Sequence, residues 1–265
     1  MTAGPSGLSD LVRRRELVFL LVGRDLKVRY KRSALGMLWT LVNPLLQMTV
    51  YSLVFSTIMR VGVPQFPVFL LSGLLPWSLV SVSATSSAHA LLDNQGLIRK
   101  IAVPQAVYPL SIVGSKLVDM VLSLLPLAII AAVLGRTPGP SWLLVLPAIV
   151  LAASFAAGLS LFFSSVTVFF RDVRHLIDIL FQIWFYLTPI IYPYEYLAKL
   201  PHPAIRRLLS LNPATPIVRW FQLVLYEGRV PDLRTVVVAT LSAAGALALG
   251  AAVFHRFEDR HIHYF

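Results

Sequence analysis

The chemistry most open to this chain is that of clustered positive charge. Five Lys and Arg side chains fall within nine positions near the N-terminus, and a long apolar stretch follows from about Leu38. Cationic side chains pair strongly with phosphate groups, and basic residues beside an apolar span also orient a membrane protein. Phosphate contact and topology alone are both open for this basic segment, whose residues are Arg24, Lys27, Arg29, Tyr30, Lys31 and Arg32.

A second candidate is the short polar loop of residues 92–103, which lies between two apolar stretches. A glycine interrupts this loop and a basic pair follows it. A short helix there could enter a groove of a soluble subunit, although a plain connection between two spans explains the loop equally well. The candidate contacts, which we call the docking loop, are Asn94, Gln95, Gly96, Leu97, Ile98, Arg99 and Lys100.

Aromatic side chains form a third candidate. Trp184, Phe185 and Tyr186 follow one another inside an apolar stretch, deeper than the aromatic belt that marks a membrane interface. Aromatic faces stack on sugar rings, so these residues could line a passage for a glycan. Packing against lipid or against other helices is the simpler alternative.

Enzymatic chemistry has no candidate. The chain has no cysteine and no phosphate-binding loop of the G-x-x-x-x-G-K-[ST] type, so ATP for transport would have to bind to another chain. His255, His261 and His263 gather near the C-terminus, where we predict a solvated tail and no metal site. The sequence therefore predicts no catalytic residue and no cofactor in this chain.

The composition indicates a membrane protein. Of 265 residues, 57% are hydrophobic and only 13% are charged, against about 25% charged in a soluble domain. We predict an all-α polytopic fold in which residues 1–265 form one transmembrane domain. The net charge of +11 lies at the ends of apolar runs, which favours topology and anionic lipid over nucleic acid.

The apolar stretches set the expected elements, because a spanning helix needs roughly 20 residues. Residues 9–35 are predicted to form an amphipathic interface helix, and the proline-rich residues 193–231 to form short re-entrant or surface helices. Pro44 should kink or break the first span. The six predicted spans cover about residues 38–59, 67–89, 108–134, 142–170, 176–192 and 233–254.

The distribution of charge predicts the topology. Six spans place both termini on one side, where Lys and Arg are more numerous than on the other. The positive-inside rule then places both termini in the cytoplasm. Ionisable residues within the spans are scarce, which disfavours ion-coupled transport. Lys116 and Asp119, three residues apart in the third span, can pair on one helical face.

Seven short motifs occur in one order along nearly the whole chain. They are Arg24-Asp25-Leu26-Lys27-Val28-Arg29-Tyr30-Lys31, Ser33-x-Leu35-Gly36-x-Leu38-Trp39 with Asn43-Pro44, Gly73-Leu74-Leu75-Pro76-Trp77, Leu97-Ile98-Arg99-Lys100-x-x-x-Pro104, Phe170-Arg171-Asp172-Val173, Thr188-Pro189-Ile190-x-Tyr192-Pro193 and Asn212-Pro213. In these motifs the chain resembles the permease subunits of type-2 ABC exporters of cell-surface polysaccharide, which export O-antigen, capsule and teichoic acid. It departs from that family at Arg32, where glycine is frequent, and at Gln105, where a basic residue is common.

The resemblance implies a function and an assembly. It implies a homodimer in the bacterial inner or plasma membrane, bound to two copies of an ABC ATPase subunit that carries ATP and Mg. It implies that the docking loop and the interface helix touch those ATPases. A pore at the dimer axis would move a lipid-linked polysaccharide, such as a polyprenyl-pyrophosphate-linked glycan of lipopolysaccharide biosynthesis, out of the cytoplasm. Some cations of the basic segment could then attract the lipid pyrophosphate, and a role in topology alone is the alternative.

Two alternatives remain open from the sequence. One is an export permease of the same superfamily for teichoic acid or for another lipid or a drug. The other is a membrane scaffold that transports nothing and only anchors a soluble enzyme.

Overall fold

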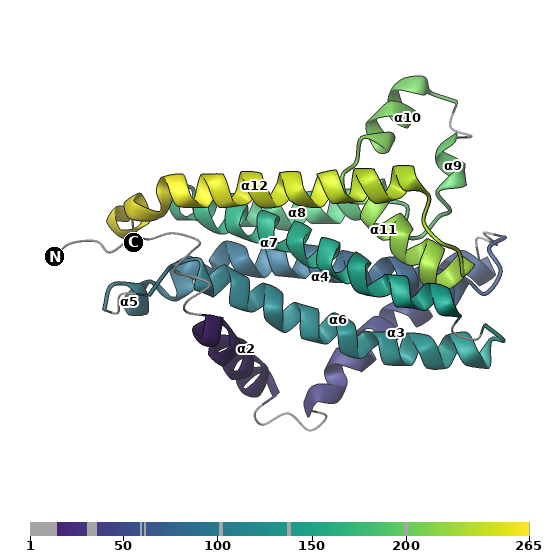
Figure 1. Ribbon diagram of the computed structural model, residues 1–265, viewed down its shortest axis with the longest axis horizontal. Helices are drawn as coiled ribbons and strands as arrows, with labels where there is room; N and C mark the ends of the chain where they lie inside the picture. The colour runs from purple at the N-terminus through teal and green to yellow at the C-terminus, as the bar shows by residue number, and fades with distance from the viewer. Residues whose placement is uncertain are drawn as a thin grey trace.

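The computed structural model describes residues 15–30, 36–58, 60, 62–100, 103–136, 139–198 and 201–264. Its secondary structure in these ranges is helical throughout, as predicted (Figure 1). Lys31 and Arg32 of the basic segment lie outside the described residues.

Helix α4 (Phe66–Asp93) is the centre of the bundle. Its sequence is apolar on all sides, and Pro67 stands in the first turn, where no backbone hydrogen bond is lost. Its second half carries buried small residues such as Ser83, Ala84 and Ser87. Small side chains let neighbouring helices approach closely, so α4 can be enclosed by other helices rather than by lipid.

Three long helices build the rest of the bundle. They are α6 (Val107–Val133), α7 (Val145–Phe169), which follows the short turn η3 (Pro140–Leu144), and α12 (Leu233–Tyr264). Helices α6 and α7 pack against α4, and α12 packs along α7. Helices α7 and α12 meet backbone to backbone, because a Cβ atom built on Gly250 would overlap the backbone of Gly158. In a membrane, such contacts between small residues are a main source of helix association.

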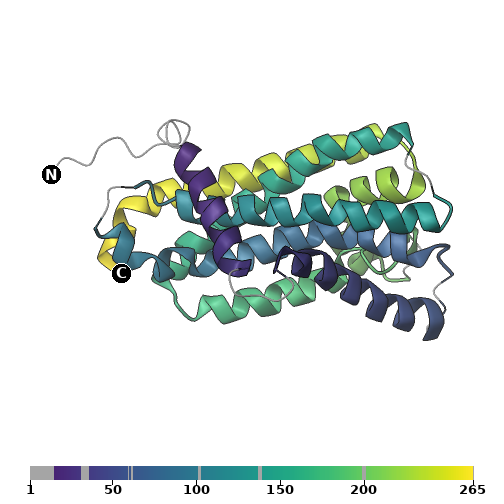
Figure 2. The same ribbon diagram turned by 90° about the horizontal axis from the view of Figure 1, so that it is seen from below.

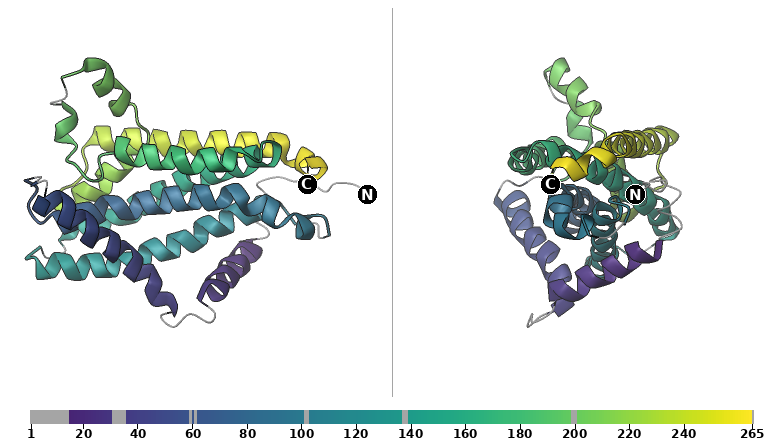
Figure 3. Two further views of the ribbon diagram at one scale, coloured as in Figure 1. Left: turned by 180° about the vertical axis from the view of Figure 1, so that it is seen from behind. Right: turned by 90° about the vertical axis from the view of Figure 1, so that its left-hand side faces the viewer.

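The remaining helices lie at the edge of this core. Helix α2 (Arg15–Tyr30) crosses the bundle and packs on α6 (Figure 2). Helix α3 (Trp39–Tyr51) continues through Pro44 without a break and passes into the wider turns of η2 (Ser52–Ile58). Helix α8 (Val173–Leu187) lies on the same side of α4 as α3 (Figure 3).

The bundle has two ends that carry different short helices. At the α5 end lie α5 (Gln95–Ile98) and the last turns of α12 (Figure 1). At the opposite, α10 end lie the small helices of the predicted proline-rich region. Helices α9 (Glu195–Ala198) and α10 (Pro203–Ser210) project from the bundle, whereas α11 (Thr215–Phe221) is buried against α4 and α12.

The observed helices match the predicted stretches with two differences in length. Five helical stretches within the described residues are long and apolar enough to cross a membrane. The predicted fifth span corresponds to α8, which has 15 residues and ends before Thr188-Pro189. The sixth predicted span was expected to end near Phe254, but α12 continues to Tyr264, so the predicted charged tail is part of a helix.

Candidate functional site

The docking loop forms a short, well-supported projection at the α5 end. The Asn94 side chain donates a hydrogen bond to the Ala90 carbonyl oxygen at 2.8 Å, and the Asn94 carbonyl accepts from the amide of Ile98 at 3.0 Å. These bonds close α5 directly after α4. The projection therefore presents its outer side chains from a fixed backbone.

Only one docking-loop side chain is buried. Ile98 is 7% exposed and packs in an apolar cluster with Tyr108 and Phe254, which belong to α6 and α12. The side chains that remain at the surface are Gln95, Leu97, Arg99 and Lys100, beside Gly96. An apolar residue flanked by polar and basic ones suits a groove on a soluble protein, and whether a partner binds there stays a prediction.

Helix α2 carries the described part of the basic segment. Arg24 lies 3.6 Å from the Asp25 carboxylate, and Lys27 follows on the same helix. Arg29 and Tyr30 form its last residues, and their side chains lie outside the description. Residues 9–14 and 31–35 of the predicted interface helix also lie outside it.

The apolar side chains of α2 face two ways. Val22 lies against Gly114 of α6, so closely that a Cβ atom on this glycine would need Val22 to move. Phe19 and Leu20 point outward and are 71% and 69% exposed. A helix that lies across the bundle with a second apolar face turned outward can rest in the plane of a membrane interface.

The predicted aromatic trio divides between the inside and the outside of the protein. Trp184 and Phe185 pack against Trp77 of α4, with ring centroids 5.8 and 6.1 Å apart. Tyr186 is 54% exposed and continues the outward apolar face of α8 that includes Ile183. Of the three, Tyr186 is therefore the one placed to meet a molecule passing beside α8, and the passage role itself stays a prediction.

Asn212 ties several of the sequence motifs into one joint. Its Oδ1 accepts hydrogen bonds from Trp184 Nε1 at 2.8 Å and from the Ala214 amide at 3.0 Å, and its Nδ2 donates to the Leu187 carbonyl and to Thr188 Oγ1. The residue thus closes the end of α8. In the sequence, Asn212-Pro213 stands out only as a short motif, and no local pattern pairs Asn212 with Trp184.

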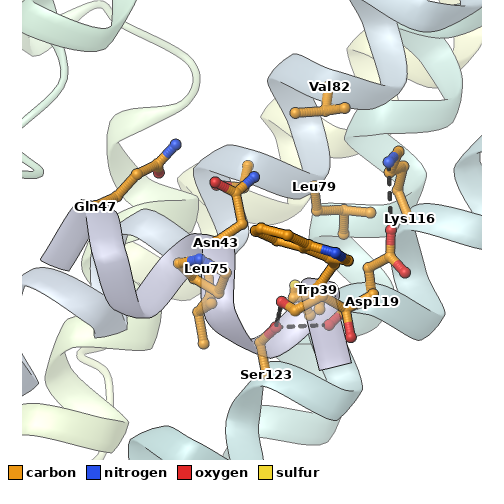
Figure 4. A pocket seen from close by; sticks show the side chains of 13 residues that line it. Trp39, Asn43, Gln47, Leu75, Leu79, Val82, Lys116, Asp119 and Ser123 are labelled. Atoms are coloured by element: carbon orange, nitrogen blue, oxygen red, sulfur yellow. Dashed lines mark hydrogen bonds and ion pairs between the residues drawn. The ribbon is translucent and has the colours of Figure 1, made fainter. Parts of the chain in front are cut away.

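A hollow of about 350 Å³, lined by both apolar and polar side chains, lies between α3, α4 and α6 (Figure 4). The predicted pair is present in its wall, where Lys116 Nζ lies 3.3 Å from Asp119 Oδ2. Ion pairs within membrane spans are costly and usually mark functional positions. The hollow is lined by Trp39, Thr40, Asn43, Pro44, Gln47, Leu75, Ser78, Leu79, Val82, Lys116, Asp119, Met120 and Ser123.

The prediction for the C-terminal histidines was wrong for His261. This side chain is fully buried, because α12 remains helical beyond residue 254 and brings its ring against Phe169 of α7. His255 is 68% exposed, as expected, and the His263 side chain lies outside the description. Within the residues described, His, Cys, Asp and Glu form no group of three that could hold a metal ion.

Comparisons with known proteins agree with the geometry. The model of the ABC-2 type transporter family matches residues 16–226. The O-antigen export system permease protein RfbA of Myxococcus xanthus is 39% identical over 248 residues, 92% of each chain. A protein of the same name from Klebsiella pneumoniae is 34% identical over 247 residues, 92% of this chain and 93% of its own. The polysialic acid transport protein KpsM of Escherichia coli is 36% identical over 84 residues, 31% of each chain.

Proposed function

Because the chain belongs to the ABC-2 type transporter family, we propose that it is the permease of an ATP-driven exporter of a lipid-linked polysaccharide. The glycan would be joined through a pyrophosphate to a polyprenyl lipid and would move from the cytoplasmic side outward. Support for this class of substrate comes from the relatives named as permeases of O-antigen export, which align over nearly their whole length.

The exposed surface of the docking loop supports this proposal most directly. Its outer residues are exposed, while Ile98 anchors it to α6 and α12. A separate ABC ATPase, which binds ATP and Mg, would grip this surface and drive the permease. The docking loop, α2 and both termini would then lie in the cytoplasm, and the α10 end would face outward from a bacterial inner membrane.

The edge of the bundle supports assembly as a homodimer with two ATPase copies. None of the described side chains of α3 is buried, and α8 exposes Ile179, Ile183 and Tyr186. Both helices lie on one side of α4 (Figure 3). Two copies that meet along this side would enclose a passage between them, with Tyr186 on its wall. Lys27 and Arg24 on α2 would attract the lipid pyrophosphate at headgroup depth.

Complementation in cells tests this function. A strain that lacks the chain should lose its surface polysaccharide and regain it with the wild-type chain. Leu97→Asp should abolish the recovery, because a charge would replace the apolar contact with the ATPase, whereas Leu211→Asp, exposed at the α10 end, should not. Copurification with the ATPase should fail only for Leu97→Asp.

The alternatives predict different outcomes of the same experiment. Surface polysaccharide that persists without the chain would exclude the proposed substrate and favour another exported lipid or a drug. An ATPase that never copurifies with the wild-type chain would favour a scaffold without transport activity.

A further inference from the structure

A chain of buried hydrogen bonds joins α7, α12 and the turn before α6 at the α5 end. His261 Nδ1 lies 2.9 Å from Gln105 Oε1, and His261 Nε2 lies 2.9 Å from Ser165 Oγ. Gln105 Nε2 donates to the Glu258 carbonyl oxygen at 3.1 Å. His261 and Ser165 are fully buried, and Gln105 is 5% exposed. We call Gln105, His261 and Ser165 the buried strut.

The hydrogen bonds of the strut fit one assignment of donors and acceptors. Since the Gln105 amide nitrogen faces a carbonyl, its Oε1 must accept, so the neutral imidazole of His261 carries its proton on Nδ1. Nε2 is then free to accept from the Ser165 hydroxyl. Each donor meets one acceptor, and such chains polarise and strengthen one another in a buried setting.

Aromatic rings hold the histidine in place. Phe169 of α7 and Phe254 of α12 have ring centroids 5.6 and 5.4 Å from that of His261. The imidazole therefore has little freedom to rotate away from Gln105 or Ser165.

The strut links the region of the docking loop to α7 and α12. The docking loop is joined covalently only to α4 and α6, and Gln105 stands between the loop and the first turn of α6. Through His261 the same point is joined to α12, and through Ser165 to α7. These two helices are locked to each other at Gly158 and Gly250, so they can follow a displacement as one body.

The strut depends on a hydrogen-bond acceptor at residue 105. A basic side chain in place of Gln105 would offer no acceptor to the His261 Nδ1–H. The strut in this form therefore needs a side chain such as glutamine at this position.

We infer that the buried strut is a coupling element, in which Gln105, His261 and Ser165 are positioning residues that transmit movement of the docking loop to α7 and α12. Only three residues separate the end of α7 from the start of α8, so the movement also reaches the base of the helix that carries Tyr186. This inference rests on the proposed function, since it assumes that an ATPase moves the docking loop.

The first test measures transport per ATP. In the reconstituted complex of permease and ATPase, Gln105→Met removes both hydrogen bonds of that side chain with little change in volume. Export per ATP hydrolysed should fall roughly five- to tenfold, the low end of the roughly 5- to 150-fold changes that typical coupling free energies produce, while ATPase binding is retained. Ser165→Ala should show the same loss. Ser164→Ala is the matched control, since Ser164 is equally buried but bonds only to Leu161 of its own helix.

The second test needs no substrate. The chain has no cysteine, so spin labels can be placed at Lys100→Cys and Asp259→Cys, on the docking loop and on α12. In the complex the distance between the labels should be narrowly distributed and equal with and without nucleotide, and Gln105→Met should broaden it.

The outcomes separate the two proposals. A wild-type complex that exports no glycan would contradict the proposed function, and the label distances would still decide the role of the strut. Equal export ratios and equal distance distributions in wild type and Gln105→Met would overturn the strut. A label distance in the wild type that changes with nucleotide would overturn it as well, because the loop would then slide past α12.

Discussion

Helix α4 and the continuous stretch of α3 and η2 are both apolar and long enough to cross a membrane, yet one is buried in the protein and the other is exposed. Of the most apolar part of α4, 78% is buried inside the chain, whereas none of the corresponding part of α3 and η2 is buried. Helix α4 is enclosed mainly by α6, α7 and α11 and forms the core of one protomer. Helix α3 has one side against α4 and α6, and its other side needs lipid or a second copy.

This difference shows where the protomer is rigid and where it can change. An interlocked backbone contact and a buried hydrogen bond hold α7 and α12 together, and α7 packs along α4. The exposed faces of α3 and α8 have few such constraints, and movements of transporters use the weakly held elements of a fold. Substitutions in the tightly packed and in the weakly held helices test this division.

The closest backbone contact among the tightly packed helices lies between α7 and α12. Gly250→Ala should destabilise the purified protein by about 3 kcal/mol or more, the upper range for overpacked cores, because the added Cβ overlaps the backbone of Gly158. Gly245→Ala on the same helix meets open space and should leave the unfolding temperature in detergent unchanged. Equal stability of the two variants would contradict the locked pair.

The same substitution in the two helices compares them directly. Leu70→Ala in α4 removes a fully buried side chain and should cost about 2–5 kcal/mol. Leu53→Ala in the continuation of α3, where the side chain is 59% exposed, should cost less than about 0.5 kcal/mol. Chemical denaturation in detergent measures both, and a loss at Leu53 as large as that at Leu70 would show that α3 belongs to the core.

Hydropathy reports where apolar stretches lie along the chain, and this limits which parts of the fold the sequence could predict. It located the five helical stretches that are long and apolar enough to span a membrane, and the short helices between α8 and α12. It could not separate α4 from α3, because lipid is as apolar as a protein interior and both environments select the same side chains. The burial of His261 also escaped prediction, since its partner Gln105 is 156 residues away and no local pattern records that contact.

The joint at the end of α8 should have a moderate effect. Asn212→Ala leaves Trp184 Nε1 and the Ala214 amide without their acceptor, which should cost about 2 kcal/mol, as expected for buried groups left unpaired. Trp184→Phe removes one donor and keeps an aromatic ring, so it should cost about 1 kcal/mol, near the net value of a single hydrogen bond. A larger loss for Trp184→Phe than for Asn212→Ala in the same unfolding assay would show that the indole, and not the amide, organises the joint.

The start of α12 should have the smallest effect. Asp232 accepts hydrogen bonds from the Thr235 hydroxyl and amide, and the hydroxyl bond is the main reason that its pKa is lowered. Asp232→Ala should cost about 1 kcal/mol, a typical value for a lost N-cap, and Asp232→Asn should cost little.

The lowered pKa also fixes the direction of the pH effect. The stability that Asp232 contributes is present above the pKa of this carboxyl in the unfolded chain and is lost as the pH falls through its folded value. The difference between wild type and Asp232→Ala in unfolding experiments should therefore shrink in acid. A difference that grows in acid would contradict the cap.

The proposed function requires an ABC ATPase to bind this permease at the docking loop. Because the chain has no cysteine, Leu97→Cys can be crosslinked in intact membranes through a single thiol, with Leu211→Cys at the α10 end as the control. We expect Leu97→Cys to capture an ABC ATPase subunit, identified by mass spectrometry, and Leu211→Cys to capture none. Capture of no ATPase at Leu97→Cys, or equal capture at both positions, would contradict it.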